Sequence, residues 1–307
     1  MTEQTIDNSA WAGAQPALSV LIPFKGDDPV RLLAALEGEG ASGAEIVLLD
    51  DGSAQAALTS RVSEQIARMR LPARLVTLER NEGRSRGRNR LVRHARARSL
   101  LFLDSDMLPD SARFLGDWLA LVATEDPPVA FGGFSLAQVQ ARPDQALHCA
   151  MASHAETLGA EDRRKAPEKH LFTSNLLVRR DVFEAEAFDE RFTGWGWEDV
   201  EWGMRVARRW PILHVDNPAT HLGLDTARVI AAKYEQSAAN FARVVDAHLD
   251  VVRTYPSYRA ARLLKLAPLR RLWRPLLKAY ALIEGAPVKS RAFAMRLYRA
   301  ALYAEAV

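Results

Sequence analysis

Two short stretches of this 307-residue sequence carry carboxylates at spacings that suit catalysis. The first is Asp104-Ser-Asp106, which directly follows the apolar run Ser99–Leu103. Two carboxylates one residue apart offer the hard oxygen ligands that Mg²⁺ or Mn²⁺ prefers, and such a cation would screen a diphosphate and assist its departure. Asp and Ser are also common turn residues at strand ends, so the triplet taken alone is equally compatible with a turn.

The second stretch is Gly194-Trp-Gly-Trp-Glu-Asp199. Its glycines let a loop close over a ligand, and the faces of Trp195 and Trp197 can stack on sugar rings. Glu198 and Asp199 would begin a helix whose dipole favours ionised carboxylates, and a carboxylate held there can act as a general base toward a hydroxyl. The alternative is a pair of core tryptophans followed by ordinary first-turn acidic residues. The repeated Gly-Trp pairs favour a functional loop.

Three further positions suit the binding of a nucleotide diphosphate. Asp51 follows the apolar run 45–50 and can accept a hydrogen bond from the imide N–H of uracil, or cap the next helix. Eight arginines lie between Arg80 and Arg98 at an expected helix start, where Arg84, Arg86 or Arg88 can bind phosphate and the others form a solvated face. His221 follows a short expected strand, where it can add a third ligand to Asp104 and Asp106.

The elements that must position these residues alternate between strand and helix. The apolar pattern predicts strands at 18–24, 45–50, 74–78 and 99–103, separated by helices at 30–37, 54–69 and 84–96. Such alternation predicts an α/β fold with a mostly parallel sheet, whose ligands bind at the carboxyl ends of the strands. Further strands are expected at 129–134, 173–178 and 212–215, with helices at 112–123, 180–187 and 198–208 and a helical chain from about residue 225.

Composition narrows the class of protein. With 48% hydrophobic and 26% charged residues, the chain is an ordinary globular protein rather than a disordered or disulfide-framed one. Its single cysteine, Cys149, cannot form an internal disulfide, and residues 1–20 show no signal-peptide pattern, which together favour a cytoplasmic location. No apolar run approaches the roughly 20 residues of a membrane helix.

Charge is distributed unevenly along the chain. The formal net charge is +3, but residues 251–307 hold twelve Lys or Arg and two Glu, a net of +10, so the rest carries −7. Apolar and basic residues alternate in the tail, which predicts either peripheral membrane association through residues 255–307, at the inner face of the membrane, or a helical subdomain packed on the acidic body. Nucleic acid is not an expected partner, because no aromatic residue lies between Arg80 and Leu100 and such binding would leave the acidic clusters unexplained.

The order of these pieces resembles inverting nucleotide-sugar glycosyltransferases of the GT-A fold. The similarity is to family 2, with the acidic loop of galactosyltransferases and chondroitin-type polymerases, and it covers about Leu18 to Asp225. The matching pieces are Ser19–Phe24, Asp50–Ser53, Asn81-x-Gly83 with Arg88-Asn89, Leu101–Asp106, Asn175–Arg180, Phe188–Phe192 and Gly194–Asp199. The resemblance implies a polar leader (1–17), a Rossmann-like GT-A domain (18–225) with a mostly parallel central sheet and flanking helices, and a basic helical C-terminal region (226–307).

The resemblance also implies how a UDP-sugar donor would be held. The Pro23 backbone and Asp51 would hold the uracil, and Asp104 the ribose or the donor sugar. Asp106 and His221 would bind Mn²⁺ or Mg²⁺ at the Asp-Ser-Asp site.

On the acceptor side, the resemblance gives roles to the acidic loop. Asp199 would be the general base, Glu198 would contact the donor or acceptor sugar, and Asn175 would lie near the donor sugar. Trp195 and Trp197 would bind the acceptor, a glycan or a lipid-linked saccharide. The implied reaction is a metal-dependent displacement at the anomeric carbon with inversion.

Three other functions remain open at this stage. A nucleotidyltransferase can share the α/β sheet and acidic metal site, but would release pyrophosphate rather than a nucleoside diphosphate. A nucleic-acid-binding protein using the Arg80–Arg98 tract would bind with a steep salt dependence. A non-catalytic relative would bind UDP without turnover.

Overall fold

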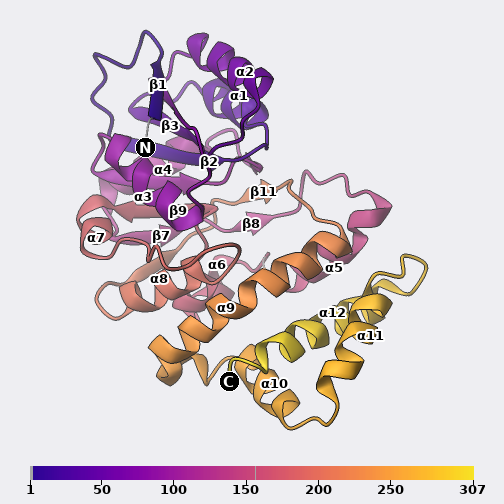
Figure 1. Cartoon of the computed structure of the whole chain (residues 1–307). Coiled ribbons are helices and arrows are strands. Elements are labelled where there is room, and N and C mark those ends of the chain that lie inside the picture. Colours follow the sequence, from indigo (N-terminus) through magenta and orange to yellow (C-terminus); the bar gives the residue numbers. More distant parts are fainter. Residues whose placement is uncertain (1–2, 156) are drawn as a thin grey trace.

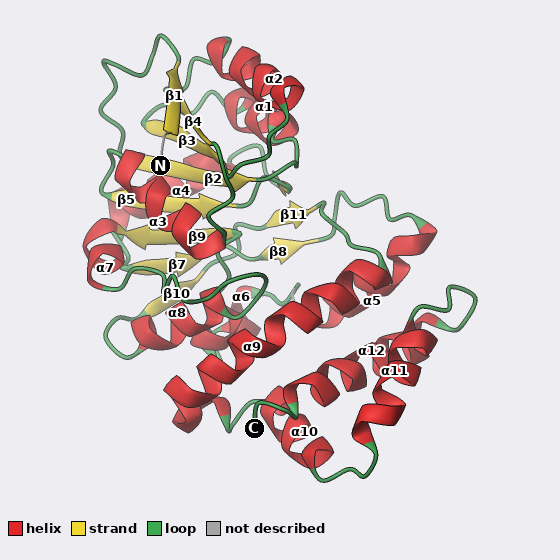
Figure 2. Cartoon of the chain, viewed as in Figure 1, coloured by secondary structure: helices red, strands yellow, loops and turns green. Residues whose placement is uncertain are grey.

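A computed structural model describes residues 3–155 and 157–307 and shows an α/β body with a helical C-terminal extension (Figures 1 and 2). The central sheet has eight strands in the order β1-β4-β3-β2-β5-β9-β7-β10. All neighbouring strands run parallel except at β1 and β9, which are antiparallel to their neighbours. In sheet order the strands are Glu3–Asp7, Ala73–Leu78, Ala44–Asp50, Leu18–Phe24, Ser99–Leu103, Asn175–Arg179, Val129–Phe131 and Ile212–His214.

Helices cover both faces of this sheet because its buried strands point alternate side chains to opposite faces. Along β2, Val20 and Ile22 pack with the helices of one face, whereas Leu21 packs with those of the other. The first face is covered by α1 (Val30–Gly38), α2 (Ala56–Ala67) and α4 (Phe114–Thr124). The opposite face is covered by α3 (Arg84–His94), α7 (Arg180–Ala185) and α8 (Glu198–Ala207).

A second, three-stranded sheet brings two predicted site residues together. Its order is β6-β11-β8, with bounds Met107–Pro109, Ala219–His221 and Phe134–Ser135. β6 begins immediately after Asp106, and the antiparallel register places His221 opposite Met107. The short sheet therefore carries His221 to the Asp-Ser-Asp edge.

The C-terminal region is a group of four helices that packs on the body. They are α9 (Ala227–Val252), α10 (Pro256–Lys265), α11 (Arg270–Ala281) and α12 (Val288–Tyr303). Helix α12 lies against α9, α10 and α11 and also contacts α5 (Ala146–Ala155) of the body (Figure 1). Short helical turns complete the chain: η1 (Pro143–Gln145), α6 (Ala160–Arg163) and η2 (Pro167–His170).

The alternation of strands and helices predicted for the first half of the chain is confirmed, with two local features that the sequence did not indicate. The polar leader includes strand β1, which pairs with β4 at the sheet edge; Met1 and Thr2 lie outside the described residues. The single strand expected at 129–134 is interrupted at Gly132-Gly133, so that β7 joins the central sheet and β8 the second one. The positive φ of Gly133 (97°), which glycine adopts at little cost, allows this change of sheet.

Candidate active site

The carboxyl ends of the parallel strands form one wall of a cavity of about 560 Å³, here named the strand-end cavity. Residues from the end of β2, the end of β3, the start of α3 and the turn after β5 line it, and α9 closes another side. The predicted site residues among its lining are Pro23, Asp51, Arg84, Arg88, Asp104, Asp106 and Trp195. The sheet thus gathers the side chains expected to hold a nucleotide diphosphate.

A second cavity of about 600 Å³, here named the loop cavity, adjoins the first. Trp195, Trp197, Glu198, Asp199 and His221 line it, together with residues from α5, α9 and α12. The two cavities share five lining residues: Arg84, Asp104, Asp106, Trp195 and Lys233. The Asp-Ser-Asp edge therefore lies where the cavities meet.

Arg88 connects the Asp-Ser-Asp edge to the acidic loop. Its guanidinium, only 2% exposed, lies 3.2 Å from Asp104 Oδ1 and 3.3 Å from Glu198 Oε1. The more exposed Arg84 approaches the same Glu198 oxygen at 3.9 Å. A buried guanidinium between two carboxylates holds both in fixed positions, so Arg88 organises the site from within.

Asp106 and His221 lie in direct contact, with Asp106 Oδ2 and His221 Nε2 3.3 Å apart. Burial favours the protonated carboxyl, but the hydrogen bond and charge of His221 outweigh it, so the pKa of Asp106 lies below its usual range. The backbone at Gly223 passes so close to this pair that a Cβ atom there would lie 1.9 Å from Asp106 Oδ2.

A further carboxylate at the shared edge was missed from the sequence. Burial raises the pKa of Asp27, and the charges of Asp106 and Asp104 add to this rise. Crowded carboxylates of this kind favour a cation. In the part of the chain that the structure describes, no three His, Cys, Asp or Glu side chains are arranged to hold a metal ion by themselves.

Asp51 has a structural role at the base of the strand-end cavity. Its two carboxylate oxygens accept hydrogen bonds from the backbone N–H groups of Glu82 (2.7 Å) and Gly83 (3.0 Å), at the start of α3. Burial raises the pKa of Asp51 despite these two bonds. The helix cap expected from Asp51 or Ser53 is not formed: α2 begins at Ala56 with no side-chain cap, and Asp50 Oδ1 accepts from Ser53 N at 2.8 Å in the loop before it. Asp51 therefore lines the cavity while it holds the loop before α3.

Asp199 carries a strongly perturbed carboxylate. Burial raises its pKa to about 7, the charge of Glu198 adds to the rise, and Arg88 acts in the opposite direction. A carboxylate with a pKa near neutrality is well matched to general-base catalysis. Its position in the loop cavity agrees with this chemistry.

The C-terminal extension holds the tryptophan loop in place. Trp197 precedes α8 in a left-handed conformation (φ 77°), which costs free energy for any residue but glycine. Its Nε1 donates to the hydroxyl of Tyr303 at 2.9 Å, and its ring packs on Phe241 with centroids 4.9 Å apart. Tyr303 also bonds Ser237 at 2.8 Å. Helices α9 and α12 thus stabilise the loop that precedes Asp199.

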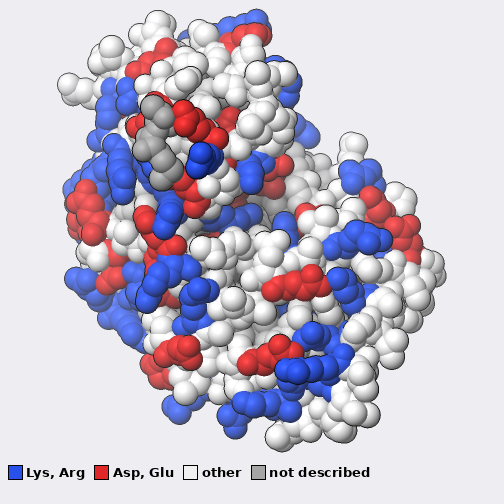
Figure 3. Space-filling model, in the orientation of Figure 1, with Lys and Arg blue, Asp and Glu red and all other residues white. Residues whose placement is uncertain are grey.

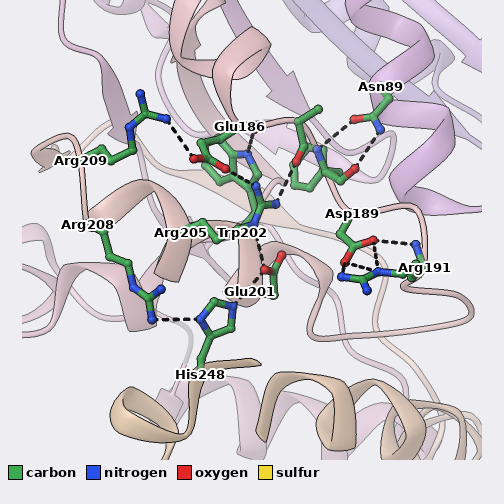
Figure 4. A network of polar contacts seen from close by, with 12 residues as sticks. Asn89, Glu186, Asp189, Arg191, Glu201, Trp202, Arg205, Arg208, Arg209 and His248 are labelled. Carbon is green, nitrogen blue, oxygen red and sulfur yellow. Dashed lines mark hydrogen bonds and ion pairs between the residues drawn. The ribbon is translucent and has the colours of Figure 1, made fainter. Parts of the chain in front are cut away.

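A polar network anchors helix α8 (Figure 4). This helix carries Glu198 and Asp199 in its first turn. The buried Glu201 Oε1 accepts hydrogen bonds from His248 Nε2 of α9 (3.0 Å) and Arg205 Nε (2.8 Å). Arg205 also bonds Glu186 after α7, at 2.6 Å. These contacts fix the helix against its neighbours on two sides, and with it the acidic pair.

Arg86, one of the candidate phosphate ligands, lines neither cavity and pairs with Glu190 at the surface. Asn175 also lines neither cavity. It is fully buried, and its Nδ2 donates to the carbonyls of Gly133 (3.0 Å) and Asn217 (2.9 Å). These bonds join β9 to the chain segments around the second sheet. Its predicted place near a donor sugar stays a prediction.

Several cavity residues could not be recognised in the sequence. Lys233 of α9 lines both cavities and bonds Asp225 at 2.5 Å, while its Nζ lies 5.7 Å from the ring centre of Trp195. His148 of α5 lies beside His221, with ring centroids 5.9 Å apart, and burial lowers its pKa to about 4. Arg299 of α12 also lines the loop cavity. None belongs to a local motif, and α5 contains no Asp, Glu, Lys or Arg that could have marked it.

Residues 19–186, more than half of the chain, match the family model described as glycosyl transferase family 2. The chain belongs to glycosyl transferase family 2. No curated protein matches this family 2 chain in sequence. The predicted membership of family 2 is therefore confirmed.

Solved structures show the fold. A mannosyltransferase from Pyrobaculum calidifontis, PcManGT, in complex with GDP-Man and Mn²⁺, is similar with a TM-score of 0.60 and 14% identity, over 96% of this chain and 88% of that one. TarS residues 1–349 from S. aureus have a TM-score of 0.53 and 17% identity, over 92% and 91% of the two chains. The same TarS fragment in complex with UDP-GlcNAc has a TM-score of 0.52 and 16% identity, over 94% and 90%. The predicted GT-A fold with a C-terminal helical extension is confirmed.

Proposed function

We propose that this family 2 glycosyltransferase transfers a hexose from a UDP-sugar to a hydroxyl group of a glycan or lipid-linked acceptor, with inversion at the anomeric carbon. One observation carries the proposal: the strand-end cavity and the loop cavity meet at Asp104 and Asp106, and Asp199 lines the second of them. A donor and an acceptor bound in the two cavities would meet at this edge.

The strand-end cavity would hold the donor. Pro23 and Asp51 would contact the uracil, and Asp51 retains acceptor capacity because each carboxylate oxygen has two lone pairs. Arg84 and the start of α3 would face the diphosphate. The structures of similar fold in complex with GDP-Man and UDP-GlcNAc support a nucleotide-sugar donor.

A divalent cation fits the residues at the shared edge. Asp106 and His221 would offer one carboxylate oxygen and one imidazole nitrogen, and diphosphate oxygens would complete the set, as is common for Mg²⁺. The third ligand expected from the sequence, Asp104, pairs through Oδ1 with Arg88 instead. Mn²⁺ in the PcManGT structure supports this assignment. When bound, the cation would neutralise charge on the departing diphosphate.

The loop cavity would hold the acceptor, as the resemblance of the Gly-Trp-Gly-Trp-Glu-Asp loop to galactosyltransferases and chondroitin-type polymerases implies. Trp195 and Trp197 present aromatic surface for a sugar ring. Asp199 would accept the proton of the attacking hydroxyl, and Glu198, held by Arg88, would orient a sugar hydroxyl between the cavities.

The reaction is then a single displacement. The acceptor oxygen forms a bond to the anomeric carbon as its proton passes to Asp199, and the bond from that carbon to the diphosphate oxygen breaks. UDP leaves with the bonding electron pair, and the glycosidic bond has the inverted configuration.

The free thiol of Cys149 supports a reducing, cytoplasmic location for this chemistry.

A donor screen tests the proposed function. The full chain is incubated with single nucleotide sugars and Mn²⁺, with and without candidate glycans, and both nucleoside diphosphate and pyrophosphate are measured. The proposal predicts UDP release that depends on acceptor. Pyrophosphate release would indicate a nucleotidyltransferase, and UDP binding without turnover would indicate a non-catalytic relative; either result would contradict the proposal.

A further inference from the structure

Helices α10 and α11 leave a row of large apolar side chains in contact with water. Of the eleven exposed large hydrophobic residues among those described, eight lie between residues 263 and 293. The five most exposed are 68–83% accessible: Leu263, Leu266, Leu269, Leu272 and Leu276. Scattered single leucines are common on protein surfaces, but a contiguous apolar row marks an interaction site.

The spacing of these leucines belongs to two helices and the turn between them. Leu263 and Leu266 are three residues apart at the end of α10, and Leu272 and Leu276 are four apart on α11, so each pair shares a helix face. Leu269 lies in the turn in a left-handed conformation (φ 53°), with its side chain 70% exposed. The five leucines, here named the leucine row, are exposed residues that follow one another along a single helix-turn-helix segment.

The surroundings of the leucine row are basic. Between residues 256 and 283 the sequence has seven Lys or Arg and no Asp or Glu. Two acidic residues reach the row: Glu305, just after α12, pairs with Arg274 at 2.7 Å and lies 4.0 Å from Arg271, and Glu235 of α9 pairs with Lys278 at 2.6 Å. Arg259, Arg262, Lys265 and Arg271 remain exposed. Figure 3 shows Lys and Arg side chains among uncharged ones along the lower edge of the molecule, where Figure 1 places α10 and α11.

We propose that the leucine row and its surrounding arginines and lysines dock the protein on an anionic lipid surface. Exposed leucines would enter the boundary between headgroups and acyl chains while the basic side chains meet lipid phosphates. The described helices include none that is long and apolar enough to cross a membrane, so the contact would lie along the surface.

Charge complementarity favours lipid over the other occupants. In a two-fold dimer through this face, the basic patch would oppose its own copy and like charges would repel. A nucleic acid would match the charge but would leave the leucines uncovered. An anionic membrane satisfies both features at once.

Helix α12 connects the docking surface to the candidate active site. Helix α12 contacts α10 and α11 on one side, and its Arg299 and Tyr303 line the loop cavity. Docking would therefore hold the loop cavity near the lipid surface. The docking proposal rests on α10 and α11 alone and does not depend on the proposed glycosyl transfer.

Co-sedimentation of the full chain with vesicles tests the docking. Vesicles of phosphatidylcholine that contain about 30% phosphatidylglycerol should bind the wild type at least tenfold more tightly than vesicles of pure phosphatidylcholine. Added salt should weaken this binding. The triple variant L266Q/L272Q/L276Q, which changes no charge, should lose binding at least tenfold. A matched variant of exposed apolar residues elsewhere, I6Q/L249Q, should bind as the wild type does.

A second pair of variants tests the charge. R262Q/R271Q should weaken binding severalfold, whereas R31Q/R68Q, which removes the same charge from exposed positions on the body, should not. Equal binding to both kinds of vesicle, or unchanged binding by the leucine variant, would overturn the proposal, as would dimerisation through the row without vesicle binding. UDP release with a soluble acceptor, measured on the same variants, should stay within about twofold of the wild type, so failure of docking is distinguishable from failure of the transferase proposal.

Discussion

Replacing Arg88 should destabilise the protein and weaken its general base at the same time. In Arg88→Met the side chain keeps an unbranched apolar stem but loses the guanidinium that bridges Asp104 and Glu198. Removing one partner of a buried ion pair costs about 3–5 kcal/mol because the remaining charge has no compensation. The Asp104 side chain is 28% exposed and Arg84 lies 3.9 Å from Glu198, so the lower end, about 3 kcal/mol, is expected.

Thermal unfolding measures this cost. A loss of about 3 kcal/mol corresponds to a fall in Tm of roughly 5 °C for a chain of this size. Arg86→Met is the matched control: Arg86 lies on the same helix, but its side chain is 53% exposed and its pair with Glu190, at 3.3 Å, is a surface one. The control should change Tm by less than about 2 °C.

The same variant makes a distinct prediction for activity. The charge of Arg88 lowers the pKa of Asp199, so the loss of Arg88 should raise that pKa above its value of about 7. A smaller fraction of Asp199 would then be ionised at neutral pH. Activity of Arg88→Met should therefore be lost most at pH 7 and partly recovered at about pH 9. An unchanged Tm, or a loss of activity that is equal across this range, would refute the bridging role.

Three further outcomes follow from the site. Because the pKa of Asp199 is about 7, the wild-type kcat/KM should fall about tenfold per pH unit below neutrality, and a limb near pH 4 would contradict an elevated base. Tyr303→Phe removes the hydrogen bond to Trp197 and should raise the KM for acceptor while leaving that for donor unchanged, with a stability loss of about 1 kcal/mol; equal effects on both substrates would argue against a loop-specific role. Glu201→Gln should cost about 3 kcal/mol in urea unfolding at pH 7. Hydrogen bonds from His248 and Arg205 outweigh burial and hold the pKa of Glu201 below its usual range, so this contribution is present at neutral pH and fades as pH falls through that depressed pKa. A difference between the two proteins that grew as the pH was lowered would contradict the assignment.

The strand-end half of the site could be predicted because its residues follow apolar runs. The runs before Asp51 and Asp104 predicted strands of one parallel sheet, and parallel strands bring their carboxyl ends to one edge. The contact between Asp106 and His221 was expected from their types, but its cause, pairing of β6 with β11, was not: each of these strands has only three residues. Such short segments show too little periodicity to be recognised.

The other residues were not predictable because they depend on packing between distant segments. Arg88 was expected to touch a diphosphate, whereas in the structure its guanidinium pairs with Asp104 and Glu198. Glu198 lies 110 positions further along the chain, so the sequence around Arg88 gives no sign of this pair. Tyr303 reaches the loop cavity from the last turn of α12, and no local pattern distinguishes it from a core tyrosine. The polar leader gave no strand signal because an edge strand need not bury either face, and β1 is exposed along its length.

Transfer and binding by Asp199→Asn test the central claim most directly. The substitution keeps the size of the side chain and removes its ability to accept a proton, while the strand-end cavity, which Asp199 does not line, is left intact. With the UDP-sugar found active in the donor screen, transfer to acceptor should fall by at least about 10³-fold while UDP binding in the presence of Mn²⁺ stays within about twofold of the wild type. Full transfer activity in this variant would show that Asp199 is not the general base.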